Sequence, residues 1–477
     1  MKAIRTLVIT ALLLLPALSV ASAQTWTPLT HQPTFGASTA LLLTDGTVMV
    51  HDGGQNWWKL SPDITGSYKN GTWAQMASLP AGYSPLYYAS AVLPDGRLVV
   101  IGGEYNFGSF AWTNLGAIYS PKTNKWAKLK HPPAWTSVGD AQSAILPNGQ
   151  MMLANALTSE QSLLDAKTLI WSADFATGKA DGNDEEGWTL LPNGRVLTVN
   201  ANLGVPASEI FDPATGVWTS AGSTVQLLTD PGSHEIGPAV LLPDGTVLAT
   251  GATGHNAVYN STTGTWSAAP DFPKVPAGQL DIADGPAALL PNGNVLCMTS
   301  PGVFNTGVRF FEWNGTAFKQ VASTPLAPVD SSYFGRMLVL PSGQILLTDG
   351  STDVELYNPT GSANPAWAPT ISKVATTLTH GKSYLLTGTQ LNGLSQGAAY
   401  GDDAQAATNY PLVRITNTAS SHVFYARTHN HSSMGVATGA ALVTTHFDVP
   451  AGIELGASKL QVVANGIAST AVAVTIN

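Results

Sequence analysis

Four carboxylate side chains occur at matching positions in consecutive segments of the chain. Each stands nine or ten residues before the glycine of a Pro-Asp-Gly or Pro-Asn-Gly turn, and they are Asp140, Glu185, Glu235 and Asp284. Carboxylates that converge on one point repel one another and hold their protons more tightly unless a cation or base neutralises them. The spacing therefore indicates an acidic ring that can hold a cation.

Two histidines near the end of the chain are candidates for completing that site. His429 and His431 are two residues apart, and an extended strand places both imidazoles on one face. With Asp284 they would form a mixed nitrogen and oxygen metal site, suited to Zn, Mn, Fe or Cu, whereas carboxylates and carbonyls alone suit Ca. The open alternatives are that the acids cap loops and that the histidines are solvated.

Other polar and aromatic residues fall on or next to the same ring. Tyr87, His234 and His429 are candidates for a general acid and base. The candidate ligand-binding residues are Tyr88, Tyr105, Asp140, Glu185, Glu235, Tyr333 and Arg336. The aromatic loops Trp57-Trp58 and Tyr105 to Trp112 either stack on sugar rings or pack at a loop base.

A regular series of glycine turns predicts the elements that carry these residues. The turn glycines lie 45 to 53 residues apart, and they are Gly46, Gly96, Gly149, Gly194, Gly245, Gly293 and Gly343. That period is typical of one four-stranded blade per interval, and Asx-Gly pairs favour the type I′ hairpin turn. We therefore expect an all-β fold, with a seven-bladed kelch-type β-propeller over residues 24–370.

Tryptophans on the outer strand candidates are interpreted as packing between neighbouring blades. Trp26 to Leu29 resembles such a strand displaced to the N-terminus, where it could close the ring against blade seven, although Trp367 competes for that place. After about residue 371 the period stops, and short alternating segments predict an immunoglobulin-like β-sandwich over residues 371–477.

Composition limits the partners. A net charge of -9 with 11% charged residues argues against nucleic acid, and a single cysteine excludes an intramolecular disulfide. Lys2, Arg5, the apolar run Leu7 to Val20 and Ala21-Ser22-Ala23 indicate a cleavable export signal over residues 1–23. A secreted or periplasmic monomer without a transmembrane segment is expected.

Two segments resemble the galactose oxidase and glyoxal oxidase family, copper-radical oxidases with a kelch propeller and a C-terminal immunoglobulin-like (early set) domain. They are Tyr87 to Tyr105 and Thr428 to Gly435. The resemblance implies that Tyr87 and His429 occupy copper-ligand positions and that an aromatic at Tyr105 stacks over Tyr87.

The rest of the family's machinery is missing from the sequence. The segment Thr34 to Ser38 lacks the cysteine that the family cross-links to its tyrosine, and Cys297 falls in blade six. The family's axial tyrosine and histidine fall near Phe334-Gly335, with Tyr333 one place out of register. A Tyr-Cys radical cofactor is therefore not expected.

Three functions remain open at this point. The first is a binding protein for a carbohydrate or similar small molecule. The second is a divergent metal-dependent enzyme, an oxidoreductase, lyase or hydrolase, at the same pocket. The third is a structural cell-surface protein. The segment Gly393 to Gly397 matches a hydrolase nucleophile elbow, but it lacks the strand before and the helix after, so it is interpreted as a glycine-rich loop.

Overall fold

The computed structural model describes residues 25–477, so the export signal predicted over residues 1–23 lies outside the described part of the chain. Within that part the fold is all-β. Its only helical segments are the 3-10 turns η1 (Ser332–Phe334) and η2 (Pro365–Trp367). No helix of the described residues is long and apolar enough to cross a membrane.

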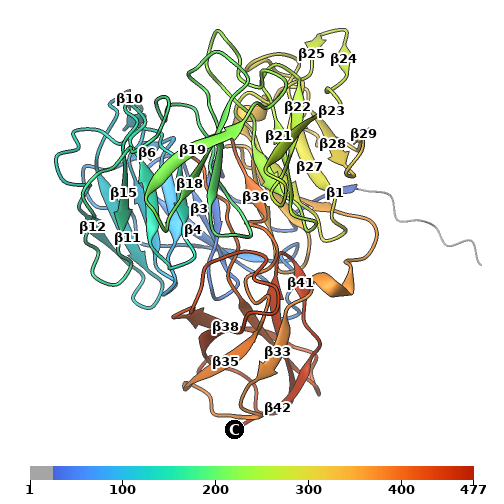
Figure 1. Ribbon diagram of the computed structural model, residues 1–477. Coiled ribbons are helices and arrows are strands. Elements are labelled where there is room, and N and C mark those ends of the chain that lie inside the picture. The colour runs from blue at the N-terminus through green and yellow to red at the C-terminus, as the bar shows by residue number, and fades with distance from the viewer. Residues whose placement is uncertain (1–24) are drawn as a thin grey trace, which may run out of the picture.

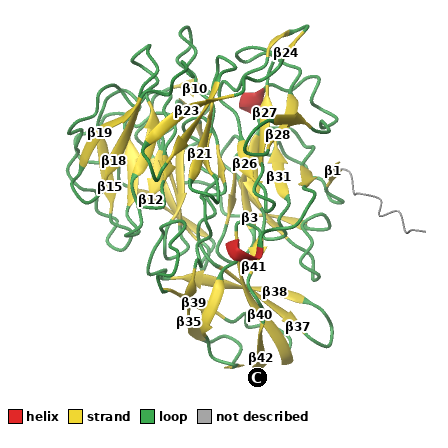
Figure 2. Cartoon of the chain, turned by 45° about the vertical axis from the view of Figure 1, so that its right-hand side comes forward, coloured by secondary structure: helices red, strands yellow, loops and turns green. Residues whose placement is uncertain are grey.

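Small antiparallel sheets repeat along residues 25–358, and Figures 1 and 2 show them gathered in the larger part of the molecule. The first four sheets contain β2 (Ala40–Leu42), β3 (Val48–His51), β4 (Trp57–Ser61) and β5 (Thr72–Gln75); β7 (Ala89–Val92), β8 (Leu98–Ile101), β11 (Gly116–Ser120) and β12 (Lys125–Leu129); β13 (Ser143–Ile145), β14 (Met151–Ala154) and β15 (Gln161–Leu164); and β16 (Thr189–Leu190), β17 (Val196–Val199), β18 (Ser208–Asp212) and β19 (Val217–Gly222).

The next three sheets repeat the pattern. They contain β20 (Ala239–Leu241), β21 (Thr246–Thr250), β22 (Asn256–Asn260) and β23 (Thr265–Ala269); β26 (Ala287–Leu289), β27 (Val295–Thr299), β28 (Arg309–Trp313) and β29 (Phe318–Gln320); and β30 (Arg336–Val339), β31 (Ile345–Thr348), β32 (Glu355–Asn358) and β1 (Thr25–Pro28). Two small ribbons lie outside these sheets: β6 (Pro85–Leu86) with β9 (Tyr105–Asn106) and β10 (Ser109–Phe110), and β24 (Lys274–Val275) with β25 (Gly278–Gln279).

Each predicted glycine turn joins the first two strands of one sheet, but its type differs from the prediction. At Leu93 to Arg97, Gly96 has φ 83° while Asp95 is not among the residues with positive φ. The Gly96 amide donates to the Leu93 carbonyl and the Leu93 amide to the Arg97 carbonyl, at 2.8 Å each. This is a type I turn followed by a left-handed glycine. The predicted type I′ turn is wrong because Pro94, at the second turn position, fixes a negative φ.

The N-terminal strand closes the last of these sheets. β1 pairs antiparallel with β32, from Thr25 opposite Asn358 to Pro28 opposite Glu355. Trp26 packs on Phe310 and Tyr357, with ring centroids 4.7 and 5.0 Å away. Trp367 instead lies against the turn glycine Gly293, so Trp26 and not Trp367 takes the closing position.

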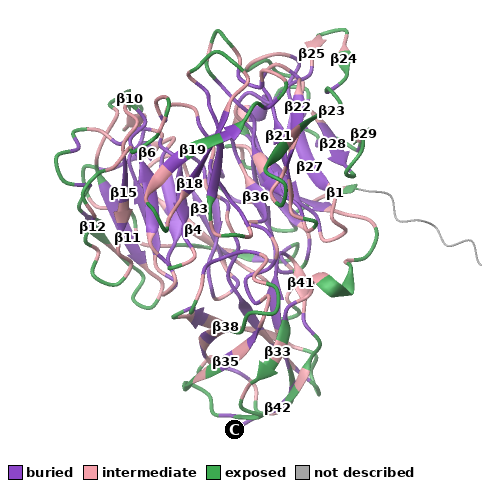
Figure 3. Cartoon of the chain, in the orientation of Figure 1, coloured by how far each residue is buried: buried purple, intermediate pink, exposed green. Residues whose placement is uncertain are grey.

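Tryptophans on the outer strands link neighbouring sheets, as predicted. The Trp126 indole donates to the Ala77 carbonyl at 2.9 Å, and the Trp266 indole to the Ser208 hydroxyl at 2.8 Å. Trp218 donates in the same way to Gln161 at 3.0 Å. Each of these acceptors belongs to the preceding repeat. The first strands of the sheets are buried. Cys297 is fully buried in β27, which Figure 3 shows in purple.

The C-terminal residues form one nine-stranded sheet system with its own apolar core. Its strands are β33 (Thr370–Lys373), β34 (Thr377–Leu378), β35 (Ser383–Thr389), β37 (Leu412–Asn417), β38 (Val423–His429), β39 (Val443–Asp448), β40 (Gly456–Ala464), β41 (Ile467–Ala468) and β42 (Val472–Ile476). This part packs on the turn ends of the first sheets, since the Thr428 and Met434 amides donate to the Thr44 and Pro147 carbonyls at 3.0 Å each.

We expect Trp26→Ala to lower the free energy of unfolding by about 2 kcal/mol, because it removes a half-buried indole that packs on two rings. It also removes the hydrogen bond to the Ala322 carbonyl. Urea unfolding followed by fluorescence measures the change. Ile170→Ala is the control, since Ile170 is 67% exposed and its loss should change stability by less than about 0.5 kcal/mol. Equal stability of the two variants would contradict closure by β1.

Candidate functional site

A cavity of about 380 Å³ opens where the first strands of several sheets begin. It is lined by Tyr87, Glu104, Tyr105, Asp140, Glu185, Glu235, Asp284, Phe304, Tyr333, Asp402 and Asp403. All four carboxylates that the sequence places on one ring therefore share one cavity. Tyr105 and Tyr333, which the sequence analysis names as ligand-binding candidates, also line it, as does Tyr87, the candidate general acid or base.

Strained backbone precedes the strands at this cavity. Tyr87, Glu185 and Asp284 have φ values of 50°, 60° and 44°, and they lie just before β7, β16 and β26. The left-handed region costs a residue with a side chain about 1 kcal/mol or more. The same strain at three matching positions points to a constraint that local sequence preference does not supply.

Two further carboxylates come from the C-terminal part of the chain. The segment 395–410 leaves the C-terminal sheet and enters the channel between the repeated sheets, where β36 (Ala398–Ala399) pairs with β26. It returns past β2, where the Tyr410 hydroxyl donates to the Leu42 carbonyl. We call residues 395–410 the inserted segment. Its tip carries Asp402 and Asp403, which are only 4% and 3% exposed.

Four further residues of the cavity are not predicted from the sequence: Asp402, Asp403, Glu104 and Phe304. A signal for the first two was present, because they are the only charged residues between Lys382 and Arg414. The glycine-rich stretch Gly393 to Gly397 begins the inserted segment as a loop. Its Ser395 hydroxyl accepts from the Gly397 amide at 3.1 Å, so that hydroxyl has a structural role.

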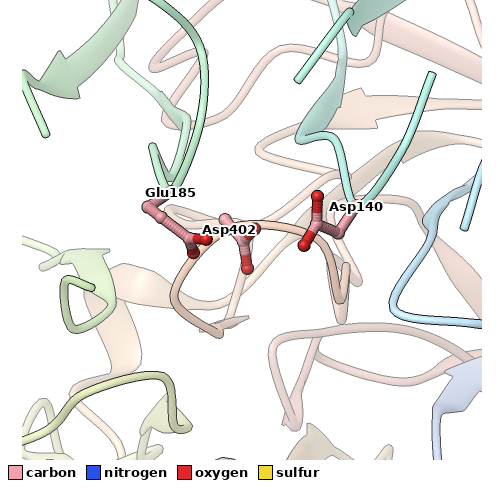
Figure 4. A group of neighbouring side chains, drawn as sticks. All are labelled: Asp140, Glu185 and Asp402. Carbon is pink, nitrogen blue, oxygen red and sulfur yellow. The ribbon is translucent and has the colours of Figure 1, made fainter. Parts of the chain in front are cut away.

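The carboxylates form two groups that share Glu185. In one group, single oxygen atoms of Asp140, Glu185 and Asp402 lie within 4.8 Å of one another. Figure 4 shows the carboxyl groups of Glu185 and Asp140 directed toward Asp402 from opposite sides. In the other group, single oxygens of Glu185, Glu235 and Asp284 meet the same limit.

One cation stands near this set in the described residues. The Arg336 guanidinium lies over the Tyr400 ring at 3.8 Å, and its Nη1 donates to the Tyr333 carbonyl at 2.7 Å. Asp403 accepts the Tyr88 amide at 2.8 Å. Burial raises the pKa of Asp403, and the charge of Arg336 opposes that rise. The charge of Arg336 opposes the rise in the pKa of Asp284 too, but less than burial and Asp403 promote it.

Unpaired oxygens confirm the shortage of partners. Within the described residues, Glu235 Oε2 and Asp140 Oδ1 are buried and accept no hydrogen bond. Glu235 is only 8% exposed. A buried polar atom without a partner costs on the order of 1–3 kcal/mol, so these two oxygens lack an interaction that buried oxygens ordinarily make.

The acids respond to this environment by holding protons. Burial, followed by the nearby charges of Asp284 and Asp402, raises the pKa of Glu235 far above its ordinary value. Burial and the charge of Asp403 likewise raise the pKa of Asp284, to about 7. The pKa values of Asp140, Glu185 and Asp402 are raised well above the usual range for the same two reasons.

Another acidic group in the chain shows the contrast. Lys179 Nζ lies 2.6, 2.9 and 2.8 Å from carboxylate oxygens of Asp181, Glu186 and Glu209, and its side chain is fully buried. That group has its own cation and needs no other. The cavity carboxylates have no lysine among them.

Aromatic rings form the rim of the cavity. Tyr105 meets Tyr87 edge to face at 6.1 Å, and Phe110 continues the row at 6.0 Å from Tyr105. Phe304 and Tyr333 meet edge to face, with ring centroids 5.2 Å apart. Trp57 and Trp58 are not part of this rim. Trp57 is fully buried, and Trp58 stacks on Phe35 with ring centroids 4.5 Å apart.

Three predicted site residues take other positions. Tyr88 is 2% exposed and its ring packs near His51. Its contact with the site is the backbone amide, which donates to Asp403. Arg336 is 8% exposed and does not line the cavity, although its charge acts on Asp403. His234 is exposed outside the lining, with Nδ1 2.8 Å from the Asn202 side-chain oxygen.

The structure does not bring His429 and His431 to the carboxylates. His429 Nε2 lies 2.9 Å from Asp448 Oδ1, and His431 Nδ1 lies 2.9 Å from the Thr445 hydroxyl. The His431 amide donates to Pro94 in a turn between inner strands. That turn ends β7, whereas the cavity is at its beginning, and a strand rises about 3.3 Å per residue. A mixed imidazole and carboxylate metal site with Asp284 is therefore wrong.

No family model matches the chain, and no curated protein matches it. Among solved structures, a fungal alcohol oxidase of the AA5 family in complex with copper is similar, with 12% identity, a TM-score of 0.54 and coverage of 95% of this chain and 100% of that chain. The extracellular domain of a hybrid two-component system from B. thetaiotaomicron is similar too, with 12% identity and a TM-score of 0.50 over 96% of this chain and 59% of that chain. These likenesses establish an all-β, β-propeller-like fold alone.

The cavity residues do not fit the copper-radical centre that the resemblance implies. Tyr87 is in place and Tyr105 meets it edge to face, but no cysteine or histidine lines the cavity. Cys297 is buried in β27, and His429 is bound to Asp448. The donors present are oxygens, which suit hard cations such as Ca²⁺, Mg²⁺ and Mn²⁺ better than copper.

The raised pKa values predict a pH dependence in cation-free protein. Carboxyls such as Glu235 keep protons in the folded state that the unfolded chain releases near pH 4. Stability in EDTA should therefore fall as pH rises from 7 to 9, by up to about 1.4 kcal/mol per pH unit for each such group. The buried His51 and His431 have lowered pKa values of about 4 and 3, so they stay neutral throughout this range.

Urea unfolding at a series of pH values measures this slope. A divalent cation should reverse it, since bound cation replaces the protons. Glu235→Gln should reduce the slope in EDTA, and Glu160→Gln, a change outside the cavity, should leave it unaltered. A stability that stays level or rises across this range in EDTA would contradict the assignment of protonated acids.

Proposed function

We propose that this chain is a secreted or periplasmic binding protein that holds an oxygen-ligated divalent cation in its cavity and a carbohydrate over it. In this proposal residues 24–370 are a seven-bladed kelch-type propeller and residues 371–477 an immunoglobulin-like domain. The observation that carries it is Glu235, whose buried Oε2 has no partner among the described residues and belongs to an acidic group of the cavity.

The cation follows from charge and donor type. Five carboxylates in two groups stand without a lysine among them, and the one nearby guanidinium, Arg336, is shared between Asp403 and Asp284. A divalent ion supplies the missing partner for the unpaired oxygens and removes the repulsion that raises the pKa values of these acids. Carboxylates alone select a hard ion.

The carbohydrate follows from the combination of cation and rim. Sugar hydroxyls ligate hard cations, and the apolar faces of sugar rings pack on aromatic side chains such as Tyr105. The cavity volume of about 380 Å³ falls in the range of small-ligand pockets. A purely structural role leaves unexplained why several strained and desolvated acids are gathered in one place.

A metal-dependent enzyme is the second candidate, and backbone strain favours it. Tyr87, Glu185 and Asp284 all adopt left-handed backbone at the cavity, and such strain clusters at sites of chemistry. Burial raises the pKa of Tyr87 to about 12, so its hydroxyl is protonated at neutral pH. It suits a general acid beside a metal ion, as in a lyase or hydrolase.

Metal content tests the proposed cation. Protein treated with EDTA and dialysed against Ca²⁺ or Mn²⁺ should retain the ion, measured by inductively coupled plasma mass spectrometry. Asp284→Asn should weaken its affinity at least about tenfold, because one ligand and one charge are lost. Asp281→Asn is the matched control, since Asp281 is 3% exposed with an unpaired oxygen but lies outside the lining. Retention of no divalent ion would sink the proposal.

Sugar binding is tested separately on the cation-loaded protein with a glycan array. A glycan identified there should lose about tenfold in affinity for Tyr105→Ala, the equivalent of about 1.4 kcal/mol for one stacking ring. Metal content should not change in that variant. Phe318→Ala, on the distant strand β29, is the aromatic control. If no glycan binds and a substrate is turned over instead, the enzyme is favoured.

A further inference from the structure

We infer that the cavity binds a pair of divalent cations, bridged by the carboxylate of Glu185, and not a single ion. This inference rests on the proposed cation site and deepens it. It comes from the way the five carboxylates divide into two groups that share one member.

The geometry of each group fits one ion. Calcium binds oxygen at 2.3–2.6 Å and magnesium at about 2.0–2.1 Å, so ligand oxygens on opposite sides of one ion lie roughly 4–5 Å apart. The oxygens of Asp140, Glu185 and Asp402 lie within 4.8 Å of one another, as do those of Glu185, Glu235 and Asp284. Each group therefore surrounds a volume that a single hard cation spans.

The second group also contains a carboxylate oxygen without a partner. Glu235 is 8% exposed, and its Oε2 has no hydrogen-bond partner in the described residues. The first group has an unpaired oxygen too, Asp140 Oδ1. An ion placed in either group alone leaves the buried oxygen of the other group without a partner, and leaving it so carries a cost.

The number of carboxylates also favours two cations. The two groups contain five carboxylates: Asp140, Glu185, Glu235, Asp284 and Asp402. Once ion binding has displaced the protons from all five, one divalent ion leaves three negative charges uncompensated in a buried site, whereas two ions leave one. Arg336, whose charge also acts on Asp284, is available for the remainder. Glu185 is assigned as the bridge because it is the one member common to both groups and its carboxylate has two oxygens.

Only the first of the two ions would draw on the inserted segment. Asp402 comes from the inserted segment and completes the first group, while Glu185, Glu235 and Asp284 all precede strands of the repeated sheets. Loss of an outer ligand should therefore remove one ion and spare the other. Loss of Glu185 should weaken both.

Manganese is the probe for the experiment. Purified full-length protein is titrated with Mn²⁺ by isothermal titration calorimetry, with metal content checked by mass spectrometry and the bound ions examined by electron paramagnetic resonance. We expect two ions per chain. Carboxylate-bridged ions lie about 3.5–4 Å apart, and their magnetic coupling should replace the sharp signal of isolated Mn²⁺ with a broad coupled one.

Variants assign the two positions. Asp140→Asn and Glu235→Gln should each retain one ion, with the uncoupled signal restored. Glu185→Gln should lose at least about tenfold in affinity for both ions. Asp281→Asn should keep two coupled ions. Circular dichroism and the thermal midpoint in EDTA identify any variant that fails to fold, and the wild-type stoichiometry stands without them.

The outcomes separate this inference from the proposed function. One ion per wild-type chain, with the signal of an isolated ion, leaves the proposed cation site in place and overturns the pair. Two ions without magnetic coupling overturn the bridge. Absence of any bound Mn²⁺, with none of Ca²⁺ either, overturns both proposals.

Discussion

Repulsion among buried carboxylates acts where the repeated sheets meet the inserted segment. Asp402 and Asp403 are carried by residues 395–410 into a space already occupied by Asp140, Glu185 and Asp284. The segment is held by contacts remote from the acids, including the strand pairing of Ala398–Ala399 with β26 and the Leu289 amide, which donates to the Gly397 carbonyl at 2.7 Å. The hydrogen bonds of the backbone thus keep like charges together, and protons or cations must compensate them.

The location of this site follows from the direction of the inner strands. Every repeat begins its first strand at the cavity end and finishes it at a Pro-Asx-Gly or related turn, on which the C-terminal sheet packs. The residues just before the strands therefore face one end of the channel and the turns face the other. His429 and His431 lie at the turn end, and Asp402 and Asp403 reach the opposite end only because the inserted segment runs along the channel.

The sequence was informative where residues repeat and uninformative where the chain makes a single excursion. Turn glycines recur in every repeat, so aligning them brings Asp140, Glu185, Glu235 and Asp284 to one level, and the structure places all four in one cavity. Asp402 belongs to no repeat. Its position depends on long-range pairing of β36 with β26, between residues more than one hundred positions apart. The repeat pattern of the sequence does not predict such a contact.

The cavity keeps only part of the copper-radical centre found in the family that the sequence resembles. Tyr87 and Tyr105 keep the implied aromatic pair, yet copper-radical chemistry needs a thiol and imidazoles at the same cavity, and none lines it. What lines it instead is a set of oxygens, two of which, Asp140 Oδ1 and Glu235 Oε2, have no hydrogen-bond partner within the described residues. The scaffold fixes where ligands converge, while the residue types at those positions choose the ion. Carboxylates line the cavity of this chain, and oxygen donors suit hard cations better than copper.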